Sequence, residues 1–154
     1  MQPRLKAVQE ILDSYIEKSD NPRKYYTHSY GVAAFASMLA ARRGLNQQLA
    51  AVMGLLHDIS AIHSGTYDHH DIVGAKMATE IMGNIGLFTP AETSIVSQAI
   101  LRHDARSMQH SPYDELLKDA DILYPHFSNI PEKINPAVAP RVENMLQELN
   151  IAPL

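Results

Sequence analysis

The spacing of the apolar residues limits most strongly what this chain can fold into. Apolar residues recur at helical intervals along most of the sequence, and no segment shows the alternating, β-branched pattern that is typical of a strand. A helix with one apolar face buries that face against other helices. The sequence therefore predicts an all-α fold, in which residues 1–154 form a single-domain helical bundle of about six or seven helices.

Capping residues and prolines predict where the helices begin and end. Thr89, Pro90 and Glu92 form a capping box with proline at the first helical position, which is the strongest start signal in the chain. The stretch Ser60 to Asp68 contains Gly, Ser and Thr and is expected to be a loop. The predicted helices run from about Pro3 to Glu17, Pro22 to near Gly44, Asn46 to His57, His70 to Asn84, Pro90 to His103 or Asp104, Pro112 to Tyr124, and Pro136 to Leu149.

Composition excludes several classes of site and partner. The chain contains no cysteine, so any bound metal is held by nitrogen and oxygen. A net charge of -4 provides no basic surface for a phosphate backbone, so we expect no nucleic-acid polymer as partner. The longest apolar run, from Gly31 to Ala41, is well short of the roughly 20 residues that cross a bilayer. The N-terminus lacks the apolar centre of a signal peptide, which predicts a cytoplasmic protein without a membrane partner. These features leave the oligomeric state open.

The histidines and aspartates gather at the expected helix ends. The pair His57-Asp58 is the most unusual, because it follows the apolar run from Ala50 to Leu56 where the chain enters the core. A buried imidazole beside a buried carboxylate is costly unless a cation compensates them. The alternative is that the helix reaches the surface at His57 and both side chains are solvated.

Five segments together give the sequence a resemblance to a known family. They are THSYGVAAFA with His28, AAVMGLLHDIS with His57-Asp58, HHDIVGAKMA with His70, SQAILRHDA with His103, and LLKDADILY with Asp121. In this order, over Thr27 to Tyr124, the chain resembles the HD superfamily of metal-dependent phosphohydrolases. The resemblance implies an HD-domain-like helical fold.

The resemblance also implies a ligand set for one or two divalent metal ions, whether manganese, iron, nickel, zinc or magnesium. The basic site would comprise His28, His57, Asp58 and Asp121. In family members with two metals, the carboxylate that corresponds to Asp58 bridges the ions, and histidines that correspond to His70 and His103 complete the second site. His70 is preferred over His69 because it stands four residues before Gly74-Ala75, and His69 is the fallback.

The implied activity is hydrolysis of a small phosphate ester, with nucleotides among the candidates, by a metal-activated water. Asp58 is the candidate catalytic residue, because it could orient that water or accept its proton. Arg106 lies three residues after His103, and Lys118 lies three before Asp121, so both are candidate substrate-binding cations. The alternative for both is that they are solvated surface charges.

Departures from the family pattern narrow the function. The residues after His57-Asp58 are Ile59-Ser60-Ala61-Ile62, without the acidic pair of alarmone hydrolases, and the Gly-Lys and Gly-Tyr-Pro signatures of cyclic-di-GMP phosphodiesterases are missing as well. A generic phosphohydrolase remains. Two alternatives stay open: a di-iron oxygenase of the same fold, and a non-catalytic HD-like signalling module.

Overall fold

The computed structural model describes residues 2–129 and 134–152, and within these ranges its regular elements are all helices. The all-α prediction is confirmed. The described residues form eight helices, one more than the upper end of the prediction: α1 (Pro3–Ile16), α2 (Pro22–Arg43), α3 (Gln47–Leu56), α4 (Ile59–Ser64), α5 (His70–Ile85), α6 (Pro90–Arg102), α7 (Pro112–Asn129) and α8 (Ala139–Glu148). None of them is long and apolar enough to cross a membrane.

Side-chain caps begin three of the predicted helices. The side chain of Asn21 accepts a hydrogen bond from the backbone N–H of Lys24, and Asn46 caps α3 in the same way. Thr89 and Glu92 form the expected capping box of α6. Local side-chain chemistry therefore determines these starts.

Three boundaries differ from the sequence prediction. The loop expected over Ser60 to Asp68 begins with helix α4, because Ile59, Ala61 and Ile62 bury apolar side chains there. Helix α7 continues through Pro125, whose fixed φ is compatible with a helix. Helix α8 begins at Ala139, three residues after the predicted start at Pro136. The side chain of Asn135 accepts a hydrogen bond from the N–H of Ala137 and forms a turn before the helix begins.

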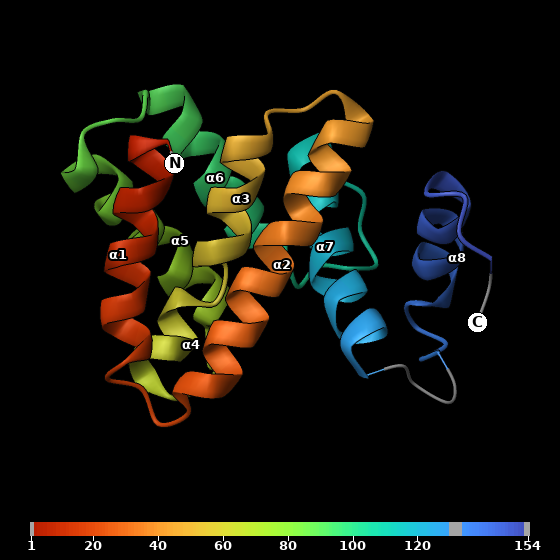
Figure 1. Cartoon of the computed structure of the whole chain (residues 1–154), viewed down its shortest axis with the longest axis horizontal. Helices are drawn as coiled ribbons and strands as arrows, with labels where there is room; N and C mark the ends of the chain where they lie inside the picture. The colour runs from red at the N-terminus through yellow and green to blue at the C-terminus, as the bar shows by residue number, and fades with distance from the viewer. Residues whose placement is uncertain (1, 130–133, 153–154) are drawn as a thin grey trace.

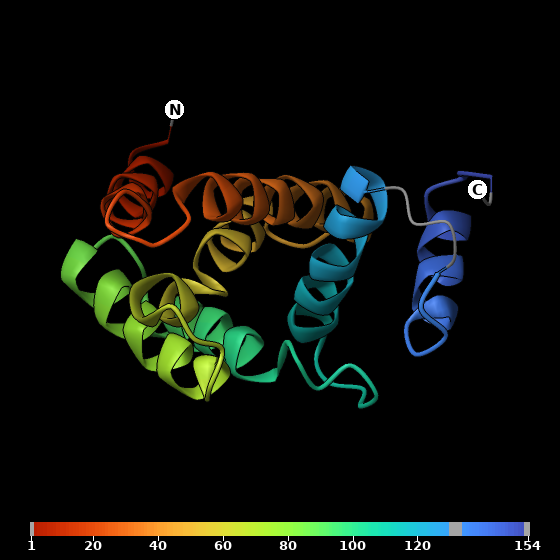
Figure 2. The ribbon, with the colours of Figure 1, turned by 90° about the horizontal axis from the view of Figure 1, so that it is seen from below.

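Helix α3 lies at the centre of the fold. All residues from Leu49 to Leu56 are buried, as expected for a helix that other helices surround. In Figure 1, α1 and α2 flank α3 on the left and right. In Figure 2, α5 and α6 lie on the side of α3 opposite to α2, and α7 closes one end. Helix α8 lies at the edge beyond α7. The C-terminal end of α3 therefore opens into the space between α2, α5, α6 and α7.

Two glycines allow α2 to approach its neighbours closely. A Cβ at Gly54 of α3 would lie 2.5 Å from the Cα of Ala33 in α2, and a Cβ at Gly31 of α2 would lie 2.1 Å from the ring of Tyr124 in α7. His28 is one turn before Gly31, and His57 is one turn after Gly54. Both close contacts therefore bring His28 towards residues at the ends of the other helices.

We expect Gly54→Ala to lower the free energy of unfolding by about 1–3 kcal/mol, because the added methyl group overpacks the contact between α2 and α3. Gly83→Ala is the matched control, since Gly83 is also inside a helix but has no atom within 4 Å of an added Cβ. That change should raise stability by about 0.5–1 kcal/mol. Urea denaturation measures the stability change of both variants. The packing argument is contradicted if Gly83→Ala loses stability and Gly54→Ala does not.

Candidate metal centre

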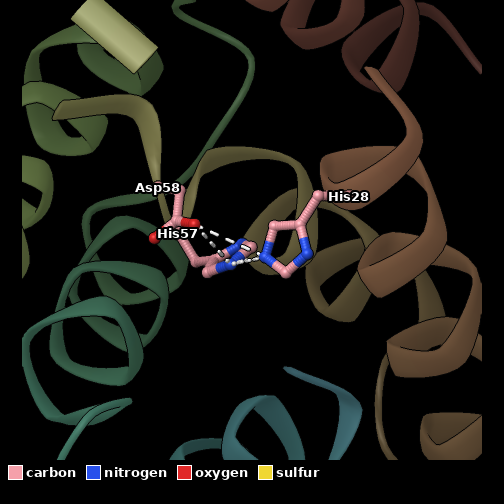
Figure 3. A group of neighbouring side chains, drawn as sticks. All are labelled: His28, His57 and Asp58. Carbon is pink, nitrogen blue, oxygen red and sulfur yellow. Dashed lines mark hydrogen bonds and ion pairs between the residues drawn. The ribbon is translucent and has the colours of Figure 1, made fainter. Parts of the chain in front are cut away.

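Four of the predicted ligands converge on one point from separate helices. His28 comes from α2, His57 and Asp58 from the junction of α3 and α4, and Asp121 from α7. The Nε2 atoms of His28 and His57 are 3.1 Å apart. An Asp58 oxygen lies 3.4 Å from each of these nitrogens, and an Asp121 oxygen lies 3.3 and 3.4 Å from them. Figure 3 shows His28 facing His57 and Asp58. We call these four residues the inner cluster.

A second group of donors adjoins the inner cluster through Asp58. The Nε2 atoms of His70 and His103 lie 3.2 Å apart. Asp58 Oδ1, the oxygen that faces away from His28 and His57, lies 3.7 Å from Nε2 of His70 and 3.8 Å from Nε2 of His103. Each carboxylate oxygen of Asp58 therefore faces a different pair of imidazoles. We call His70, His103 and Asp58 Oδ1 the outer cluster.

The orientation of the rings shows that both clusters fit a cation. The Nδ1 atoms of His57, His70 and His103 lie 2.8, 2.8 and 2.6 Å from backbone carbonyl oxygens. A carbonyl can only accept, so each Nδ1 carries a proton. In the neutral form of such a ring the lone pair is on Nε2, which points at the neighbouring imidazole. Two lone pairs at 3.2 Å repel unless a positive charge lies between them. Carbonyl-anchored histidines of this kind are the usual support of metal-ligating imidazoles.

Burial and charge together set the protonation of the inner cluster. Burial of the His57 ring opposes its protonation, but the Asp58 charge and hydrogen bonds with both carboxylates outweigh it and raise the pKa of His57 well above its ordinary value. Burial likewise favours a neutral Asp121 and Asp58, yet His28 and His57 hold the pKa of both carboxyls well below the usual range. Without a metal, a proton on the histidines therefore balances the carboxylates.

We expect binding of the first metal ion at pH 7 to release at least about one proton, because the pKa values of His57 and His28 are both raised and the metal displaces the protons that these rings hold. The two carboxylates are already ionised and release none. The apparent Kd should rise roughly tenfold for each unit that the pH falls below the His57 pKa. Calorimetric titrations in buffers of different ionisation enthalpy measure the proton count, and a value of zero would contradict this protonation state.

A pocket of about 460 Å³ opens above the two clusters. Arg106 lines it and donates a 2.6 Å hydrogen bond to Asp121 Oδ2, the oxygen that faces away from the histidines. His69 lines it as well, but its side chain is exposed and lies outside both clusters. The structure thus brings together all six predicted metal ligands and places Arg106 beside them.

The structure does not place Lys118, the other candidate substrate-binding cation, at the pocket. Its side chain is fully buried and does not line the pocket. The ammonium group donates to the carbonyl of Met108 and the Nδ1 of His110, and it forms an ion pair with Glu115 at 2.7 Å. The chain between α6 and α7 folds over this end of α7, so Lys118 holds that connection in place instead of meeting a ligand.

Three residues that line the pocket were not predicted from the sequence: Tyr67, Asp71 and Asp104. Asp104 lies beside the outer cluster, and Tyr67 packs edge-on against the ring of His70. Burial together with the charges of Asp58 and Asp121 raises the pKa of Tyr67 to about 12, so its hydroxyl stays protonated. The signal for Asp104 was available, because His103-Asp104 repeats the His-Asp pair at positions 57 and 58.

Comparison with known proteins identifies the family of this chain. A family model described as HD domain matches residues 25–125, which is more than half of the chain. The chain belongs to the HD domain family. The resemblance drawn from the five segments is thereby confirmed, and the matched range of the HD domain contains every member of the two clusters.

Sequence relatives of this HD domain include longer proteins. Ribonuclease Y 2 of Levilactobacillus brevis is 34% identical over 98 residues, which cover 62% of this chain and 16% of that protein. Ribonuclease Y of Chlorobium phaeovibrioides is 30% identical over 96 residues, covering 62% and 17%. The chain therefore spans less than a fifth of the length of these relatives.

A solved structure resembles the HD domain over nearly its whole length. The crystal structure of a predicted HD superfamily hydrolase from an uncultured Thermotogales bacterium matches with a TM-score of 0.72 and 25% identity, covering 96% of this chain and 88% of that one. The family and this neighbour support a metal-dependent hydrolase, and the His and Asp groups could hold its metal.

Proposed function

We propose that this HD domain is a phosphohydrolase that cleaves a small phosphate ester or nucleotide with a water activated at a two-metal centre. The observation that carries the proposal is the pair of clusters that share Asp58 at the base of an open pocket. The proposed ligands are His28, His57, Asp58 and Asp121 for one ion, and His70, His103 and Asp58 for the other.

Divalent ions in these positions would act as Lewis acids and would lower the pKa of water. The protein fixes the orientation of the ligand side chains. His57, His70 and His103 are fixed by their carbonyl partners, and Asp58 is held between both pairs of rings. Because the pKa of Asp58 is held so low, this carboxylate is a weak proton acceptor. Its lowered pKa favours bridging over the role of general base that the sequence left open.

Arg106 is the proposed partner of the substrate phosphate. It is the one arginine or lysine among the described residues that line the pocket, and 38% of its side chain is exposed. One nitrogen holds Asp121, and the planar guanidinium can present its other N–H groups to a phosphate oxygen. Arg106 would thus orient a ligand carboxylate and attract the substrate at once.

We expect Arg106→Ala to lower kcat/KM by about 10- to 100-fold, because it removes charge-assisted hydrogen bonds to the substrate. Arg102→Ala is the matched control, since Arg102 also pairs with a buried aspartate, Asp114, but does not line the pocket. Both changes remove one ion pair, and thermal melts report that shared cost. Equal kinetic losses in the two variants would contradict a substrate role for Arg106.

The function is tested by metal analysis followed by a substrate screen. Protein purified without added metal is analysed for bound ions and then assayed with manganese, iron, nickel and magnesium. The panel contains nucleotides, phosphomonoesters and a short RNA oligonucleotide, since the sequence relatives are ribonucleases by name. Turnover of a phosphomonoester or nucleotide supports the proposal. An oxygen-dependent reaction with a di-iron absorption signal would replace it with an oxygenase, and a centre that binds no metal would leave a non-catalytic module.

A further inference from the structure

The carboxylate of Asp104 spans the two rings of the outer cluster. Its Oδ2 lies 3.3 Å from Nε2 of His70, and its Oδ1 lies 3.7 Å from Nε2 of His103. The Asp58 oxygen lies no closer to either nitrogen, at 3.7 and 3.8 Å. Asp104 is therefore placed as well as Asp58 to bind an ion that lies between the rings of His70 and His103.

The chain builds the Asp104 position in the same way as the Asp58 position. His57 caps the C-terminal end of α3 and His103 caps that of α6, and each donates Nδ1–H to a carbonyl three residues earlier. An aspartate follows each histidine directly. After His103, the Arg106 N–H donates to the Asp104 carbonyl and turns the chain along the pocket. The fold thus presents the same His-Asp unit from two helices.

The inner cluster has one more carboxylate ligand than the outer cluster as proposed so far. It contains two imidazoles and two carboxylates, each of which lies near both rings. The outer cluster, as proposed so far, contains two imidazoles and one shared carboxylate. Asp104 would make the two donor sets equal. Carboxylate oxygen together with imidazole nitrogen is a donor set that suits iron, manganese and zinc.

We propose that Asp104 is a terminal ligand of the outer metal ion, so that each ion is held by two histidines and two aspartates with Asp58 shared. This inference rests on the proposed two-metal function. The two sites then differ in accessibility, because 53% of the Asp104 side chain is exposed while its counterpart Asp121 is 8% exposed. The outer ion exchanges faster and is lost first on dialysis.

A weaker reading makes Asp104 a solvated acid that contributes only negative charge to the pocket. Asp71 separates these readings. It lines the same pocket, but within the described part of the chain no hydrogen bond or ion pair joins it to an imidazole of either cluster. Asp71→Asn therefore removes the same charge from the pocket without removing a donor from the outer cluster.

The experiment compares wild type, Asp104→Asn and Asp71→Asn in equilibrium dialysis against manganese, with bound metal counted by elemental analysis. We expect wild type to bind about two ions, Asp71→Asn to match it within about twofold in both affinities, and Asp104→Asn to keep the first ion while the Kd of the second rises by at least about tenfold. Cobalt substitution adds a spectroscopic readout, because losing a carboxylate alters the visible absorption of the outer ion alone.

Each result has a distinct meaning. Asp104→Asn with unchanged second-ion affinity overturns the role of Asp104 and leaves the two-metal function standing. Equal losses in Asp104→Asn and Asp71→Asn show a field effect and overturn the ligand role too. A wild-type protein that binds one ion under saturating manganese overturns the two-metal function and this inference with it. Asp104→Glu, which keeps the donor, should recover part of the second-ion affinity.

Discussion

Asp58→Ala is expected to abolish hydrolysis, with a loss of at least about 1000-fold in kcat, or roughly 4 kcal/mol in the activation barrier. The physical reason is that Asp58 serves both clusters. One oxygen faces His28 and His57, and the other faces His70 and His103. With the carboxylate removed, four imidazoles surround the space where two ions are proposed, and the bridge between the ions is gone.

The same substitution should remove most of the thermal stabilisation that metal confers. Metal binding stabilises only the folded state, so a variant that binds weakly gains little when metal is added. Melting temperatures with and without manganese measure this difference. Asp68→Ala is the control, because Asp68 is an exposed aspartate in the connection before α5. Full metal content in Asp58→Ala would contradict the bridging role.

The sequence predicted the helices best where a local signal governs them. The predicted capping box at Thr89 forms, and the helices predicted to begin near Pro22 and Asn46 are capped within one turn by the side chains of Asn21 and Asn46. Helix α4 was missed because its sequence contains serine and is followed by glycine, while its burial depends on distant helices. Tertiary packing thus determined the boundary that local propensity left ambiguous.

The sequence analysis identified the residues of the candidate site that the family resemblance covers, and it did not identify Asp104 or Tyr67. Spacing preferred His70 over His69, and the structure places the ring of His70 beside His103 while His69 takes a left-handed backbone conformation at the pocket edge. Lys118 was chosen by the same kind of spacing argument, and the structure places it away from the pocket. A helical offset from Asp121 gives a direction, but it does not show that another segment covers that part of the helix.

We expect the number of bound metal ions to depend on His70 and His103. His70→Ala and His103→Ala should each reduce bound manganese from about two equivalents to about one, while the fold and the inner ion are retained. Each removes one of the two rings of the outer cluster and leaves His28, His57 and Asp121 untouched. The remaining ring and Asp104, with Asp58 shared with the inner ion, leave the outer ion a single imidazole and bind it much more weakly.

The control for this stoichiometry is His69→Asn, which changes a histidine that lines the pocket outside both clusters, and asparagine tolerates the left-handed backbone found there. It should keep two ions. The facing rings of His70 and His103 are the reason to expect the loss in the other two variants. The dipole of helix α6 could account for a histidine at position 103, but it does not explain a second ring turned towards it at 3.2 Å. A wild-type stoichiometry near one, or two ions retained in His103→Ala, would leave these histidines to bind water or substrate.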